Sequence, residues 1–121
     1  MNTTQQAFTD AIRDNRINAS TSIAAVIGDP VKHSLSPVIH NAGFRSLGVD
    51  WVYVAFEVAA GKTADSLSAL RTLHLRGLSV TMPHKTEMAR LVDRSSAAAI
   101  TLRSVNTVEV ASDGALVGHS T

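Results

Sequence analysis

Lys85 is the residue whose position most suggests chemistry. It follows the apolar segment Gly77–Val80 by way of Thr81 and Pro83. Because proline cannot donate to a strand ladder and restricts the residue before it, the segment is expected to be a strand that ends near Pro83, with a helix starting over residues 84–91. Ligands of open α/β sheets gather at the carboxyl ends of the strands, where a lysine could act on them. The other interpretation is a surface lysine in a loop.

Ser34 and Ser36 form a second polar group, placed before an expected helix. Ser36 is a good N-cap residue, and Pro37 suits the first helical position, where its missing N–H costs nothing. Two hydroxyls at a helix N-terminus favour an anion such as a carboxylate. The alternative is that Ser36 only caps the helix and Ser34 only satisfies the loop backbone. The helix is expected to stop near Gly48 and to carry a broad apolar face of Val38, Ile39, Ala42, Phe44 and Leu47.

Thr81 and the pair Asn106 and Thr107 extend this polar set, since they are also expected at strand ends. Hydroxyl and amide groups both donate and accept hydrogen bonds, so they match the hydroxyls of a sugar-like ligand. Together with the serines and Lys85, they suit a small ligand that has a carboxylate and several hydroxyls.

Other chemistries lack their motifs. The five histidines show no metal-ligand spacing such as His-x-x-x-His, so no metal site is predicted. The 121 residues contain no Gly-x-Gly-x-x-Gly and no Gly-x-x-x-x-Gly-Lys-Ser/Thr, hence no recognisable cradle for nucleotide phosphates. A Gly-x-Ser-x-Gly hydrolase elbow is also missing.

The elements that must position the polar set alternate between strand and helix. Helices are expected over residues 4–16, 37–47 and 62–75, the first with a capping box of Thr3 and Gln6 and the third with an inner face of Ala64, Leu67, Leu70 and His74. Strands are expected over residues 22–28, 51–58 and 77–80, and a second short helix over residues 95–99. Two short apolar segments flank Asp113-Gly114, a strong hairpin signal. The fold class is therefore α/β: a three-layer, mostly parallel sheet flanked by helices, with a C-terminal antiparallel hairpin.

Composition excludes several classes of protein. A net charge of +1 without a basic run is unlike a nucleic-acid binder. The apolar segments are far shorter than the roughly 20 residues of a membrane span, and the N-terminus lacks a signal-peptide pattern. With zero cysteines, the chain fits a reducing compartment. We expect a cytoplasmic protein with a single domain, in which residues 1–20 form an accessory helix and linker.

Four motifs lie in order along residues 24–121: Gly28-x-Pro30-Val31-x-His33-Ser34-x-Ser36-Pro37-x-x-His40-Asn41, Val80-Thr81-x-Pro83-x-Lys85, Val105-Asn106-Thr107 and Gly114-x-Leu116-x-Gly118-x-x-Thr121. Their residues and spacing closely resemble the N-terminal, substrate-binding domain of the shikimate dehydrogenase family. The resemblance implies NADP-linked reduction of 3-dehydroshikimate to shikimate in the aromatic amino-acid pathway.

Carried over by position, the resemblance assigns a role to each polar residue. Ser34 and Ser36 would hold the substrate carboxylate, and Thr81 and Asn106 its ring hydroxyls. Lys85 would be the catalytic lysine, a general acid toward the carbonyl oxygen. The family's lysine works with an aspartate that follows the last motif.

The chain departs from the family pattern at several places. Thr121 is its last residue, so the aspartate and the nucleotide-binding domain are not part of it. Ser79 stands at a substrate-contacting position that is usually asparagine, Ser120 replaces another asparagine, and Arg103 occupies a position that is often glycine. A paralogue that acts on quinate or a related acid is a further hypothesis.

The leading hypothesis is the substrate-binding domain of a shikimate dehydrogenase-like enzyme, without hydride transfer or NADP binding by this chain alone. The chain would then be a truncated gene product or an excised fragment. The alternatives are a stand-alone module that binds shikimate or quinate without turnover, and an inactive remnant. We also expect a possible homodimer through the cleft face, because apolar residues meant for a second domain would be exposed.

Overall fold

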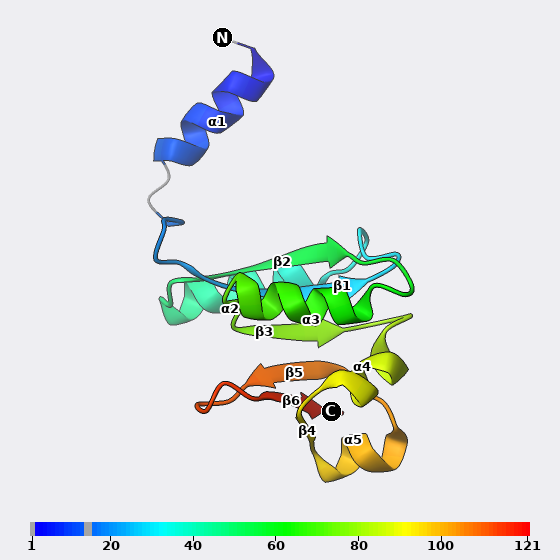
Figure 1. Ribbon diagram of the computed structural model, residues 1–121. Coiled ribbons are helices and arrows are strands. Elements are labelled where there is room, and N and C mark those ends of the chain that lie inside the picture. The colour runs from blue at the N-terminus through cyan, green and yellow to red at the C-terminus, as the bar shows by residue number, and fades with distance from the viewer. Residues whose placement is uncertain (1, 14–15) are drawn as a thin grey trace.

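The computed structural model describes residues 2–13 and 16–121 and has an α/β architecture (Figure 1). In chain order the elements are α1 Thr3–Arg13, β1 Ser22–Gly28, α2 Ser36–Leu47, β2 Trp51–Glu57, α3 Thr63–Thr72, β3 Gly77–Val80, α4 Lys85–Leu91, β4 Arg94–Ser95, α5 Ala97–Leu102, β5 Thr107–Val110 and β6 Leu116–His119. Figure 1 shows α1 projecting from the body that the other elements form.

The described strands form one sheet in the order β2-β1-β3-β5-β6-β4. β1 pairs in parallel with both β2 and β3, while β5 runs antiparallel to β3 and β6. The fold-class prediction is thus confirmed, including the C-terminal hairpin of β5 and β6. The short strand β4, which pairs in parallel with β6, is an addition that the sequence pattern did not predict.

β1 is buried on both faces because its side chains alternate between two apolar clusters. Ala25 and Ile27 pack with residues of α3 and α4 on one face. Val26 packs with Tyr53 on the other face, where Phe44 of α2 covers it. Each fully buried aliphatic side chain of this kind contributes about 1.5–3 kcal/mol. Helices on both faces make the predicted three layers.

α2 contacts the sheet through only part of the predicted apolar face. Phe44 packs on the cluster of Val26 and Tyr53, whereas Val38, Ile39 and Leu47 are 68%, 65% and 77% exposed. Asn41 adds a polar contact: its amide accepts from the Tyr53 N–H at 2.8 Å and donates to the Tyr53 carbonyl at 2.9 Å. β2 is an edge strand, so its outer backbone groups need partners, and a polar residue supplies them.

The ends of α1 differ from the prediction. Asn2 and Gln5, one residue earlier than the predicted Thr3 and Gln6, form the reciprocal cap: Gln5 N–H donates to Asn2 Oδ1 at 2.8 Å and Asn2 N–H to Gln5 Oε1 at 3.1 Å. Among the described residues α1 covers Thr3–Arg13, and residue 16 lies in a turn, so the helix does not extend to residue 16 as predicted. Residues 14–15 lie outside the described part.

α3 is shorter than predicted, and some residues of its inner face differ from the predicted ones. It stops at Thr72, because His74 adopts a left-handed conformation with φ 53°. Leu67 and Leu70 are buried as predicted, but Thr63 and Ser66 complete the inner face in place of Ala64 and His74, which are exposed. The two hydroxyl residues are tolerated inside because both are hydrogen-bonded. α5 likewise begins later than predicted, capped by Ser96, whose Oγ accepts from the Ala99 N–H at 3.2 Å.

Candidate functional site

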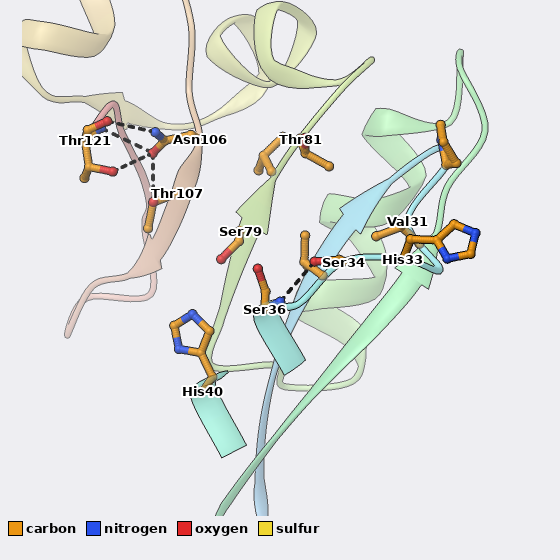
Figure 2. A pocket seen from close by; sticks show the side chains of 13 residues that line it. Val31, His33, Ser34, Ser36, His40, Ser79, Thr81, Asn106, Thr107 and Thr121 are labelled. Atoms are coloured by element: carbon orange, nitrogen blue, oxygen red, sulfur yellow. Dashed lines mark hydrogen bonds between the residues drawn. The ribbon is translucent and has the colours of Figure 1, made fainter. Parts of the chain in front are cut away.

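A cavity of about 760 Å³ opens where β1 and β3 end (Figure 2). Its walls come from the segments that follow these two strands and from the chain around β5 and β6. The lining residues are Val26, Pro30, Val31, His33, Ser34, Ser36, His40, Ser79, Val80, Thr81, Asn106, Thr107 and Thr121. The position agrees with the rule that ligands bind at the carboxyl ends of parallel strands.

Gly28 allows the two loops that follow β1 and β3 to meet. Thr81 N–H donates to the Ile27 carbonyl, and Asp29 N–H donates to the Met82 carbonyl, both at 3.0 Å. A Cβ on Gly28 would overlap Thr81 Cγ2 and lie 3.2 Å from the Met82 oxygen. The close approach of the loops therefore requires glycine at this position. The peptide bonds before the two prolines of these loops are cis.

Ser34 and Ser36 both line the cavity, but the Ser36 side chain does not cap α2 as predicted. α2 is capped by Leu35 without a side-chain bond, so the prediction that Ser36 is the N-cap is wrong. Leu35 already has helical dihedral angles, which leaves Ser36 inside the first turn. Ser34 Oγ accepts from the Ser36 N–H at 3.2 Å. The Ser36 hydroxyl is therefore not used for capping, and Figure 2 shows it directed toward Ser79.

Tyr53 lies behind this part of the cavity wall and was not predicted. It is 4% exposed, and its hydroxyl donates to Ser79 Oγ at 2.6 Å. Its ring stacks on His40 with a centroid separation of 4.3 Å. Burial raises the pKa of Tyr53, although hydrogen bonding with Ser79 and, more weakly, with Ser36 opposes the shift. A lone tyrosine in an apolar strand was the available signal, because a buried phenol needs a partner.

Asn106 forms the opposite wall and is held by neighbouring hydroxyl residues. Its Nδ2 donates to the Thr121 carbonyl at 3.1 Å, and its Oδ1 accepts from Thr107 Oγ1 at 2.9 Å and from Thr121 Oγ1 at 3.2 Å (Figure 2). The Asn106 backbone carbonyl accepts from the Val80 N–H at 2.8 Å, which fixes the segment beside the end of β3. An amide nitrogen carries two hydrogens, so a second one can serve a ligand.

Lys85 is the predicted site residue that the cavity lining does not include. It is the exposed first residue of α4, and its backbone carbonyl accepts from the Val105 N–H at 3.0 Å. Val105 precedes Asn106, so the Lys85 backbone is held next to a segment that lines the cavity. The other predicted residues, Ser34, Ser36, Ser79, Thr81 and Asn106, all line the cavity.

His84 anchors the chain immediately before Lys85. It is fully buried, with Nε2 at 2.5 Å from the Val58 carbonyl and Nδ1 at 2.5 Å from Thr63 Oγ1. Because a carbonyl can only accept, Nε2 carries the hydrogen, and Nδ1 accepts from the threonine hydroxyl. The start of α4 is thereby fixed to the segment between β2 and α3.

The part of the chain that the structure describes holds neither a metal-binding cluster nor a helix that could span a membrane. No three His, Asp or Glu side chains there lie close enough together to hold a metal ion. No helix within residues 2–13 and 16–121 is long and apolar enough to cross a membrane.

The family comparison agrees with the sequence motifs. The family profile of the shikimate dehydrogenase substrate binding domain matches residues 26–108. A curated shikimate dehydrogenase (NADP(+)) of Rubrobacter xylanophilus is 47% identical over 106 residues, which cover 88% of this chain and 37% of the relative. The chain thus spans a little over a third of the length of the curated relatives it matches.

Solved structures show the same relationship in three dimensions. A Listeria monocytogenes shikimate 5-dehydrogenase in complex with shikimate and NAD has a TM-score of 0.83 at 42% identity, covering 88% of this chain and 36% of that one. A shikimate dehydrogenase in complex with NADP⁺ has a TM-score of 0.81 at 38% identity, covering 85% and 36%. The resemblance seen in the sequence is confirmed, and the chain belongs to the shikimate dehydrogenase family as its substrate-binding domain.

Proposed function

We propose that the cavity binds shikimate, 3-dehydroshikimate or a related cyclic hydroxy acid such as quinate, as the substrate-binding part of an NADP-dependent shikimate dehydrogenase-like oxidoreductase. One observation carries the proposal: seven hydroxyl or amide side chains from four separate segments line one cavity at the strand ends. The Listeria relative, solved with shikimate, supports the choice of ligand.

The carboxylate is assigned to Ser34 and Ser36. Ser36 lies in the first turn of α2, a helix of 12 residues, and Ser34 lies just before it, where the helix dipole favours a negative charge. The ring hydroxyls are assigned to Thr81 and Asn106, which face the cavity from the other loops. The Thr81 hydroxyl can donate or accept, whereas Asn106 offers its second amide hydrogen, because its Oδ1 already accepts from Thr107 and Thr121.

Lys85 is assigned the proton transfer. Lys85 is the first residue of α4, and its backbone is bonded to Val105 beside Asn106, so its long side chain could turn toward a ligand in the cavity. There it would hold a proton at the oxygen that is a carbonyl in one form of the substrate and a hydroxyl in the other. Proton transfer by a positioned group is typically worth about 10²- to 10⁴-fold in rate.

NADP does not fit the residues of this chain. None of its seven glycines is arranged as Gly-x-Gly-x-x-Gly, and nothing else in the 121 residues offers a known phosphate cradle. We therefore infer that the cofactor binds another part of the complete enzyme, and that this chain alone neither binds NADP(H) nor transfers hydride. A clear thermal shift with micromolar NADP(H) would contradict this.

Two further expectations stay predictions. One is a cytoplasmic location. The other is a homodimer through the exposed cleft face, which a monomeric mass by light scattering would contradict.

Calorimetric titration with shikimate tests the proposed ligand. We expect the wild-type chain to bind shikimate and Ser36→Ala to bind it about 10- to 150-fold more weakly, because a hydrogen bond to a charged group contributes about 1.5–3 kcal/mol. Ser112→Ala, in the exposed hairpin turn, is the matched control and should leave the dissociation constant unchanged. Absence of binding at millimolar shikimate, or equal affinity for the Ser36 variant, would contradict the proposal.

A further inference from the structure

Tyr53 touches the cavity through another side chain. Tyr53 itself does not line the cavity. Its hydroxyl lies 2.6 Å from the Oγ of Ser79, and Ser79 is a lining residue. We propose that Tyr53 is a positioning residue for ligand recognition: by donating to Ser79 it commits the Ser79 hydroxyl hydrogen to the cavity, so that the ligand must present an acceptor oxygen there. The inference deepens the proposed function and rests on it.

The direction of the hydrogen bond determines what Ser79 can offer. A serine hydroxyl has one hydrogen and two acceptor sites. When Ser79 Oγ accepts from Tyr53, its own hydrogen must point elsewhere, and the open direction is the cavity that Ser79 lines. Burial raises the pKa of Tyr53, against the opposing effect of its hydrogen bonds with Ser79 and Ser36, so the phenol keeps its proton throughout the neutral range.

The sheet register explains why a tyrosine is needed for this contact. Tyr53 lies on β2 and Ser79 on β3, with β1 between them; Tyr53 is opposite Ala24, and Ser79 is opposite Val26. The Tyr53 side chain therefore reaches across one face of β1, where it packs against Val26. A phenylalanine would fill the same space but could not donate at its end.

The Tyr53 side chain has little freedom to move away from this position. Its ring stacks on His40 with an interplanar angle of 12°, and its backbone N–H and carbonyl are both bound by Asn41. Few alternative rotamers are compatible with this packing. The hydroxyl is thus a fixed donor, and the direction of the Ser79 hydrogen is set before a ligand arrives.

A double-mutant cycle separates this role from a purely structural one. We expect Tyr53→Phe to weaken shikimate binding about threefold to tenfold, the range of a single neutral hydrogen bond. In a Ser79→Ala background the same substitution should cost less affinity than in the wild type, because the main partner of the Tyr53 hydroxyl is then absent and only its weaker contact with Ser36 remains. Thermal melts of each variant report whether the fold is retained, and Ser112→Ala again serves as the control.

Three outcomes of these binding measurements would contradict the inference about Tyr53, and one of them would also contradict the proposed function. An unchanged dissociation constant in Tyr53→Phe overturns the inference alone, and leaves the proposed function standing. So does an equal loss with and without the Ser79 hydroxyl, which would mean that the Tyr53 hydroxyl acts through another partner, such as Ser36. Failure of the wild-type chain to bind shikimate overturns the proposed function and this inference with it.

Discussion

Replacing Gly28 with alanine should force apart the two loops that form the cavity. The new Cβ would overlap Thr81 Cγ2 and lie 3.2 Å from the Met82 carbonyl oxygen. Neither neighbour yields easily, because one belongs to a short branched side chain and the other to a backbone that accepts from the Asp29 N–H at 3.0 Å.

The magnitude of this change follows from opposing terms. Overpacking of this kind costs about 1–3 kcal/mol, and weakening of the Asp29 hydrogen bond adds about 0.5–1.5 kcal/mol. Alanine also restricts the unfolded chain, which returns about 0.4–1 kcal/mol. The net loss in the free energy of unfolding should be about 0.5–4 kcal/mol. Shikimate binding should also weaken, since Thr81 and Ser34 would no longer lie at their present separation.

Urea denaturation followed by circular dichroism measures the loss. Gly43→Ala is the matched control: it lies inside α2, and a Cβ there meets no atom within 4 Å. The control should gain about 0.5–1 kcal/mol from helix propensity. If Gly28→Ala is as stable as the wild type, the described contact between the two loops is wrong.

Two further predictions concern charge and buried polar groups. Hydrogen bonds from the Leu116 N–H at 2.7 Å and from Arg71 at 2.8 Å lower the pKa of Asp93 below 3.8, so this carboxylate stabilises the fold above that pH and the benefit is lost as the pH falls through its lower folded-state pKa. Asp93→Asn should melt at a lower temperature than the wild type at pH 7, with the difference shrinking in melts below about pH 3.8; a constant difference would contradict this. His84→Ala loses its bond to the Val58 carbonyl and leaves a cavity, so urea denaturation should show a loss of about 2–4 kcal/mol; a loss under about 0.5 kcal/mol would contradict the described anchor.

Features that depend on neighbours in the sequence were predictable. β1 covers residues 22–28 as expected, because an apolar run of that length is typical of a strand buried on both faces. Asp113-Gly114 marks the hairpin, since Gly114 takes φ 85°, which other residues avoid. Five of the six predicted site residues line one cavity, because the loops after parallel strands meet at one edge of a sheet.

Features that depend on partners far away in the sequence were not predictable. The apolar periodicity of α2 suggested one inner face, but the open edge of β2 selected Asn41, whose partner Tyr53 lies 12 residues away. The Tyr53 contact with Ser79 spans 26 residues and crosses a whole strand. Such contacts follow from strand order and register, which local patterns do not specify.

The central claim is that the polar cavity at the strand ends binds shikimate. Amide chemical shifts of the ¹⁵N-labelled chain during titration with shikimate, repeated with Lys85→Ala, test it most directly, with Lys62→Ala on the exposed start of α3 as control. We predict that the responding amides cluster at residues 34–36, 79–81 and 106, and that Lys85→Ala alone weakens the response. No response at these residues with millimolar shikimate would contradict the claim.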